Sequence, residues 1–153
     1  MRTIIQIALT ISLAAPAALT QPRVHYEPTT TNLLSGQITV PAGDYYRTDF
    51  QLGNQANQRL SVSFNAAGGA GTDIIVVVMP ASERPNWVNR HEAQVCYTTP
   101  GKRTTGKFEV TNFFKGVGPY VLIFGNRFSP LSRKFVEVRA DFSNLIRVVD
   151  PEP

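Results

Sequence analysis

Residues 118–142, GPYVLIFGNRFSPLSRKFVEVRADF, decide the fold class of this chain. The run 120–124 is apolar at every position, which predicts a strand that is covered on both faces of its sheet. Between 136 and 142 every second residue is apolar and the residues between them are charged, as in a strand with one face in the core and one in water. We expect these two strands to pair as a hairpin across the connection 125–133, which is too long for a tight turn.

The connection between these strands contains residue types that are typical of an ordered loop. Asn126 tolerates backbone angles that most residues avoid, and Ser129 and Ser132 are common hydrogen-bonding residues in loops. Phe128 is expected to fold back onto the domain and to be buried there. Burial of such a side chain stabilises a fold by about 1.5–3 kcal/mol, so the sequence predicts a substantial loss of stability for Phe128→Ala.

The same period of two recurs in the rest of the chain. Apolar and polar residues alternate over 46–52 and 60–64, and 73–79, DIIVVVM, is a continuous apolar run of the kind found in fully covered strands. Eleven glycines and eleven prolines punctuate these runs, no stretch has a helical period, and residues 81–90 are expected to be irregular. We predict an all-β protein of about eight strands, an antiparallel β-sandwich of the jelly-roll type.

The beginning of the chain has the features of an export signal. Arg2 is followed by an apolar centre and a small-residue region, which is the order of a secretory signal peptide. Cleavage is expected after Ala17 or Thr20, and an uncleaved anchor is the alternative. The sequence therefore predicts a secreted or periplasmic protein that has no membrane span after cleavage. Its parts are expected to be a signal peptide, a flexible arm, the sandwich domain and a tail, at residues 1–20, 21–33, 34–148 and 149–153.

Charge and cysteine content limit the partners and the chemistry. The net charge is +4 and the basic residues are scattered, whereas nucleic-acid binding favours a clustered basic face; we expect no nucleic-acid partner. A single cysteine, Cys96, excludes an intramolecular disulfide and a cysteine-based zinc site. We interpret Cys96 as a small buried hydrophobe, with an intermolecular disulfide and a catalytic thiol as the alternatives.

A spaced pattern within 118–142 suggests a family. Its members are Gly118, Tyr120, Phe124, Asn126, Phe128, Ser129, Ser132, Lys134 and Val136. This pattern resembles the end of the GOLD domain, the lumenal β-sandwich of the emp24/p24 proteins. The resemblance implies the sandwich fold and a role in protein binding. Ile123 stands where those proteins carry a strand cysteine, and the eleven residues after Phe142 leave no room for their coiled coil, membrane span and sorting tail, so we do not expect vesicle cargo sorting.

Two other elements are similar to those of uncharacterised exported bacterial β-sandwich proteins. They are the tetrapeptide 86–89, NWVN, and a glycine pair at 68–69 that precedes Asp73 and Ile74. This second resemblance fits the leader better, because it implies a small exported domain that stands alone.

The candidate binding residues surround the sole tryptophan. Trp87 is flanked by Asn86, Asn89 and His91, and an aromatic ring among amides can stack on a sugar or grip a peptide. The alternative is that Trp87 covers one end of the sandwich while the asparagines hold turns.

The sequence offers no catalytic or metal-binding constellation. No serine lies in a Gly-x-Ser-x-Gly elbow, and His25 and His91 are too far apart in the sequence to suggest a metal site. A calcium site and a glycosidase pair such as Asp44 and Asp49 are the weaker alternatives. We therefore expect a non-enzymatic module without cofactor or metal, whose partner is a protein. A carbohydrate-binding module that uses Trp87 is the second hypothesis, and a small hydrolase is the third.

Overall fold

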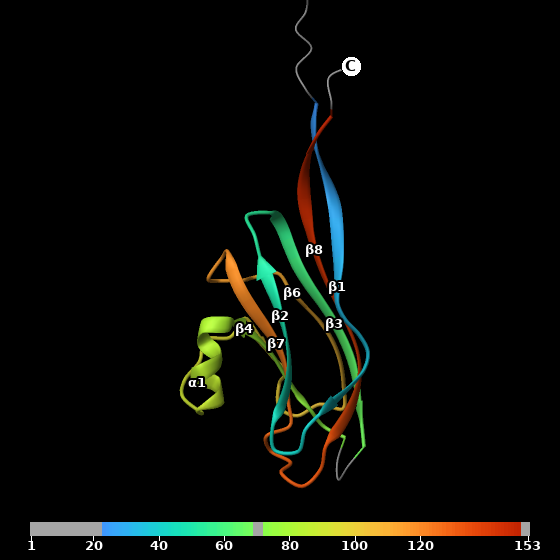
Figure 1. Ribbon diagram of the computed structural model, residues 1–153, viewed down its shortest axis with the longest axis vertical. Helices are drawn as coiled ribbons and strands as arrows, with labels where there is room; N and C mark the ends of the chain where they lie inside the picture. The colour runs from blue at the N-terminus through green and yellow to red at the C-terminus, as the bar shows by residue number, and fades with distance from the viewer. Residues whose placement is uncertain (1–22, 69–71, 151–153) are drawn as a thin grey trace, which may run out of the picture.

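The computed structural model describes residues 23–68 and 72–150, which form two antiparallel four-stranded sheets (Figure 1). One sheet has the strand order β1-β8-β3-β6 and the other has the order β2-β7-β4-β5. The strands are β1 Val24–Val40, β2 Tyr45–Leu52, β3 Ala56–Ala67, β4 Ile75–Pro80, β5 Tyr97–Thr98, β6 Thr105–Val110, β7 Gly118–Gly125 and β8 Lys134–Val149. The prediction of an antiparallel β-sandwich with about eight strands is confirmed.

The core lies between the two sheets and is filled by alternate residues of each strand. In β8 every second side chain from Lys134 to Phe142 is buried, and the side chains between them face outward. Neighbouring strands keep this register, since Phe64 of β3 pairs with Val138 and Val62 pairs with Ala140. The alternation predicted for 46–52 and 60–64 is confirmed in the same way. In each of these strands every second side chain faces the opposite sheet, and the buried ones include Phe50 and Leu52 in β2 and Leu60, Val62 and Phe64 in β3.

A short helical segment covers the outer face of the second sheet, where the sequence analysis expected irregular chain. A 3₁₀ turn, η1 Ala81–Glu83, leads directly into α1 Arg84–Val88, and α1 lies on the side of β4 and β7 that faces away from the core (Figure 1). A second apolar cluster forms there, around buried Val77, Met79, Val121 and Ile123, against which Trp87 packs. This cover explains why β4 and β7 are apolar on both faces, as their sequences predicted.

The predicted hairpin between β7 and β8 is wrong, because the two strands belong to different sheets. β7 pairs with β2 and β4, whereas β8 pairs with β1 and β3. Each strand needs only to place an apolar face on the core, and strands on opposite sides of the core both satisfy that need. The nine residues of 125–133 are long enough to cross the roughly 10 Å between packed sheets.

Asn126 fastens this crossing connection to the turn between β1 and β2. Its side chain is fully buried, and Nδ2 donates hydrogen bonds to the carbonyl oxygens of Pro41, at 3.0 Å, and Ser132, at 2.7 Å. Its backbone N–H donates to the carbonyl of Asp44 at 2.8 Å, and Ser129 N–H donates to the carbonyl of Asn126 at 3.0 Å. Asn126 is therefore the main anchor of the loop.

Phe128 is not buried as expected. Its ring is half-buried, and Lys102 Nζ lies over it at 4.4 Å from the ring centre. Of the other residues in the pattern, Tyr120, Phe124 and Lys134 are buried and Ser129 is half-buried. The loop is held by polar contacts of Asn126 and not by an apolar anchor at Phe128.

Residues 24–33 were expected to be part of a flexible arm, and they are instead the first part of β1. They pair with the end of β8, from Val24 opposite Val149 onward, and the two strands form a ribbon that extends beyond the sandwich (Figure 1). Cross-strand pairing orders this segment although its composition is polar and rich in threonine. Two residues that were expected in the tail are also paired: Val149 is the last residue of β8, and Asp150 N–H donates to the carbonyl of Arg23 at 3.0 Å.

The predicted signal peptide lies outside the described residues, as does the Gly69 of the glycine pair. Within residues 23–68 and 72–150, no helix has the length and apolar content needed to cross a membrane.

Candidate functional site

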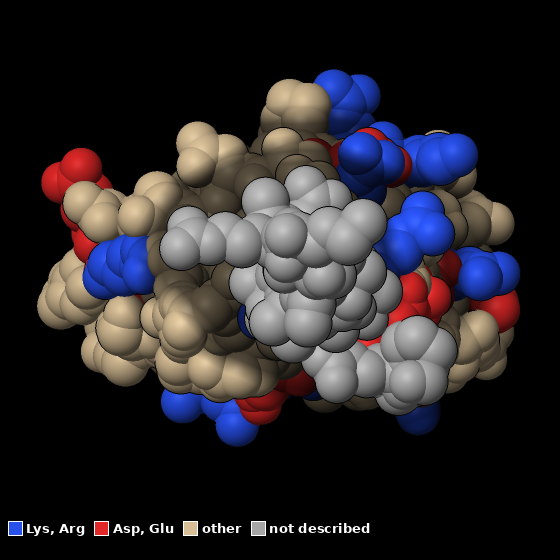
Figure 2. Space-filling view, turned by 90° about the horizontal axis from the view of Figure 1, so that it is seen from above, with Lys and Arg blue, Asp and Glu red and all other residues tan. Residues whose placement is uncertain are grey.

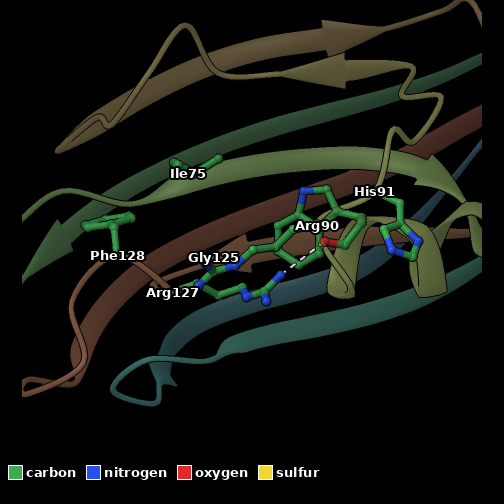
Figure 3. Close-up of a pocket in the computed structure, with 7 residues that line it drawn as sticks. Ile75, Arg90, His91, Gly125, Arg127 and Phe128 are labelled. Atoms are coloured by element: carbon green, nitrogen blue, oxygen red, sulfur yellow. Dashed lines mark hydrogen bonds between the residues drawn. The ribbon is translucent and has the colours of Figure 1, made fainter.

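A hollow of about 400 Å³ lies between α1 and the β7–β8 connection, at the end of the second sheet. Strands β4 and β7 supply its floor, α1 and the residues after it supply one wall, and the connection supplies the other (Figure 3). The lining residues are Ile75, Trp87, Arg90, His91, Gly125, Arg127 and Phe128.

Trp87 is held between α1 and the sheet. Its ring meets the ring of Tyr45 edge to face, with 5.6 Å between the centroids, an arrangement that aromatic pairs prefer. Gly125 lies under the ring, and a Cβ atom there would come within 3.4 Å of Trp87 Cη2. A distance of 3.4 Å is an ordinary van der Waals contact, so the indole lies close against the backbone of β7 at Gly125.

Arg127 binds to α1 from the opposite wall. Its guanidinium carbon lies 5.4 Å from the centre of the Trp87 ring, within the range of a cation–π contact. Nη1 of Arg127 donates a hydrogen bond to the backbone carbonyl of Trp87 at 3.0 Å (Figure 3), and Arg90 N–H donates to the same carbonyl at 3.2 Å. The two contacts of Arg127 join the two walls of the hollow, whereas the bond from Arg90 lies within one wall.

The structure brings together two of the four residues that the sequence singled out. Trp87 and His91 line the hollow, whereas Asn86 and Asn89 do not. The side-chain Nδ2 of Asn86 donates a hydrogen bond to Glu83 Oε2 at 3.3 Å, and the backbone carbonyl of Asn86 accepts one from His91 N–H at 2.9 Å. Asn89 ends α1, and its N–H donates to the carbonyl of Pro85 at 3.0 Å. The asparagines therefore hold the helix and the turn that present Trp87 and His91.

Sequence reasoning did not find Arg90 or Arg127 as site residues. Arg90 follows the helix with a positive φ of 61°, in the left-handed region that turns the chain away from α1. Arg127 adjoins Asn126, and only the crossing of the connection between sheets carries it to Trp87. No local signal in the sequence marks either arginine, because the hollow is assembled from segments far apart in the chain.

The hollow is electropositive. Its lining includes two arginines and a histidine and contains no carboxylate. Lys102 adds a further positive charge beside Phe128, and Arg84 Nη1 donates to the hydroxyl of Tyr45 at 3.2 Å. Figure 2, which looks along the molecule, shows Lys and Arg at several separate places on this face, with Asp and Glu near most of them.

The described residues contain no group of three His, Cys, Asp or Glu side chains placed to hold a metal ion. His25 lies on the ribbon, 3.0 Å from Glu27, and is not part of the hollow. Cys96 is half-buried against the core, and this burial raises the pKa of its thiol. A raised pKa leaves less of the nucleophilic thiolate, which favours the interpretation of Cys96 as a packing residue.

Glu83 connects the helical segment to neighbouring loops. Its Oε1 lies 2.5 Å from Lys115 Nζ, and its Oε2 accepts hydrogen bonds from Gln94 N–H and Asn86 Nδ2, both at 3.3 Å. The bond from Lys115, followed by those from Gln94 and Asn86, lowers the pKa of the Glu83 carboxyl below its ordinary value of 4.5. Glu83 thus holds the segment that carries Trp87 as long as its carboxylate is charged.

We expect the stabilisation by Glu83 to depend on pH. A carboxyl whose pKa is lowered in the folded state stabilises the fold above its unfolded pKa, and this stabilisation is lost as the pH falls through the folded-state pKa. The melting temperature of Glu83→Gln should therefore lie below that of the wild type at about pH 7, and the difference should shrink toward about pH 2.5. Lys115→Met should behave in the same way. A difference that is equal at both pH values would contradict this role.

No protein-family model matches the chain, and no curated protein matches it.

Proposed function

We propose that this protein is an exported, non-enzymatic binding module that recognises a protein partner through the hollow beside α1. The observation that carries the proposal is the lining of this hollow, in which Trp87, Phe128 and two arginines surround a concave surface of about 400 Å³. Tryptophan and arginine are the side chains that most often dominate the binding energy of protein interfaces. The secretory type of leader supports a location outside the cytoplasm, and the GOLD-like pattern agrees with a role in protein binding.

The preorganisation of the hollow also supports a binding role. Arg127 is hydrogen-bonded to the carbonyl of Trp87, and Tyr45 and Gly125 hold the indole ring from two other directions. Side chains that are already ordered lose little conformational entropy when a partner binds. The wall of the hollow is thus ready to make contacts without a folding step.

A carbohydrate ligand is the second candidate, because Trp87 lies beside Tyr45 as a sugar platform would require. Stacking on a sugar needs an open aromatic face, however, and the guanidinium of Arg127 lies over the Trp87 ring. A sugar would have to displace this contact. The geometry therefore favours a partner whose polar groups bind to Arg127 without displacing it from the Trp87 ring.

Peptide and glycan arrays probed with the purified full chain test the proposal. We expect capture on peptides, with a signal about tenfold lower for Arg90→Ala and His91→Ala, and no glycan capture that depends on Trp87. Arg59→Ala is the matched control: Arg59 is an exposed arginine on β3 in the other sheet, paired with Glu109 at 3.5 Å, and its loss should leave capture unchanged. Glycan capture lost in Trp87→Phe would replace the proposal by the carbohydrate module. Peptide capture that no hollow variant reduces, or no peptide capture at all, would refute it.

A further inference from the structure

Two arginines and no carboxylate line the hollow, and this positive charge limits the kind of protein segment that could bind there. An inference about that segment rests on the function proposed above. We propose that the hollow takes an acidic segment of the partner protein, with an Asp or Glu carboxylate bound by Arg90 and Arg127 and a neighbouring apolar side chain packed against Ile75 and Phe128. The segment of the partner that binds is thus one in which an acidic residue adjoins an apolar residue.

The first support is that the charges of the hollow lack partners of opposite sign. Within residues 23–68 and 72–150, Arg47, Arg59, Lys115 and Arg139 each form an ion pair with a nearby carboxylate. Neither Arg90 nor Arg127 forms such a pair, and no carboxylate lines the hollow that they share. An incoming carboxylate would therefore supply the opposite charge that these two side chains lack elsewhere in the described fold.

The second support is the donor capacity of the two arginines. A guanidinium has five N–H donors in a planar fork that matches the two oxygens of a carboxylate. The carbonyl of Trp87 takes a bond from Nη1 of Arg127, which leaves further donors on that side chain while fixing its position. Arg90 reaches the same hollow from the end of α1. Hydrogen bonds of this charged kind are about twice as strong as neutral ones.

The third support is that the hollow is not uniformly polar. Ile75 contributes an aliphatic side chain from the start of β4, and Phe128 contributes a half-buried ring from the connection (Figure 3). A small free anion would leave this apolar surface unused. A peptide that carries an apolar side chain beside its carboxylate would cover it, and the area removed from water would add to the affinity.

Trp87 makes the inference directly measurable, because it is the only tryptophan of the chain and lies in the wall of the hollow. Its fluorescence is titrated with the blocked peptide Glu-Leu-Glu-Leu-Glu and with the uncharged analogue Gln-Leu-Gln-Leu-Gln. We expect the acidic peptide to bind at least about tenfold more tightly than its analogue. We also expect Arg90→Gln to weaken the acidic peptide by about tenfold, Arg90→Lys to restore part of the loss, and Arg59→Gln to bind as the wild type does.

The outcomes separate this inference from the proposed function. Equal affinity for the two peptides, or equal effects of Arg90→Gln and Arg59→Gln, would overturn the acidic ligand while peptide binding itself stands. Tighter binding of heparin with the same dependence on Arg90 would overturn a protein segment as the ligand. No response to either peptide, together with empty peptide arrays, would overturn both proposals. Circular dichroism melting curves establish that each variant is folded before it is titrated.

Discussion

Phe124→Ala is expected to lower the free energy of unfolding by about 3–5 kcal/mol, as large-to-small changes of buried aromatic residues do. Phe124 has no exposed surface and lies in the core between the sheets. Its ring meets that of Phe64 from the opposite sheet edge to face, with 6.2 Å between the centroids. Removal of the ring leaves a cavity where the two layers meet, and the surrounding strands can close it only in part. Urea unfolding monitored by circular dichroism measures the loss.

Phe128→Ala is the matched control for this prediction, because both residues are phenylalanines of the same strand-and-loop segment. Phe128 is only half-buried, so its removal should cost about 1 kcal/mol, roughly half of the value for a fully buried side chain. This expectation replaces the larger loss that the sequence alone predicted. Equal losses for the two variants would contradict this expectation, because they would show that the half-buried Phe128 stabilises the domain as much as the buried Phe124 does.

Asn126→Asp should lower the free energy of unfolding by a similar amount at neutral pH, about 3–5 kcal/mol, since it places an uncompensated charge in a buried site. The side-chain amide donates to the carbonyls of Pro41 and Ser132, and a carboxylate there would face two oxygens with no proton to offer. Asn126→Ala removes the donors without adding charge and should cost about 1–3 kcal/mol. Urea unfolding at about pH 7 compares the two variants with the wild type.

The sign of the pH dependence gives this prediction a second test. Burial among carbonyl oxygens favours the neutral form of the new carboxyl, so its folded-state pKa is raised. The stability of Asn126→Asp should therefore be highest below the unfolded pKa of about 3.9 and should fall as the pH rises through the folded-state pKa. Asn65→Asp, on the exposed face of β3, is the control and should show no such fall. Wild-type stability of Asn126→Asp at neutral pH would contradict the anchoring role.

The sequence predicted the strands wherever every second residue is buried. The alternation in 60–64 and 136–142 marked which residues face the core, because a strand that covers a core must turn every second side chain toward it. The continuous run 73–79 correctly indicated a strand covered twice, although its second cover, α1, gave no helical signal of its own. Five residues are too few to show a period of 3.6, and α1 is held by packing on the sheet and by Glu83.

The candidate site was predictable only at its most conspicuous residue. Trp87 drew attention as the sole tryptophan, and His91 followed from its proximity in the sequence. Arg127 could not be found in this way, since it reaches Trp87 through the path of the connection between the sheets and through a hydrogen bond to a backbone carbonyl. A carbonyl acceptor is present at every residue, so no sequence pattern indicates which one is used.

The order of apolar and polar residues, by itself, determined that this chain builds a two-layered β-protein and which side chains fill its core. The reason is that successive side chains of a strand point to opposite faces of the sheet, so every second residue faces the core. Tertiary structure alone decided that β7 and β8 lie in opposite sheets, since apolar faces specify burial but not the neighbour that provides it. The same crossing placed Arg127 against Trp87 and created the electropositive hollow. The residues that line the hollow come from β4, from α1 and the segment after it, from β7 and from the connection. Only the folded arrangement of the two sheets brings them together.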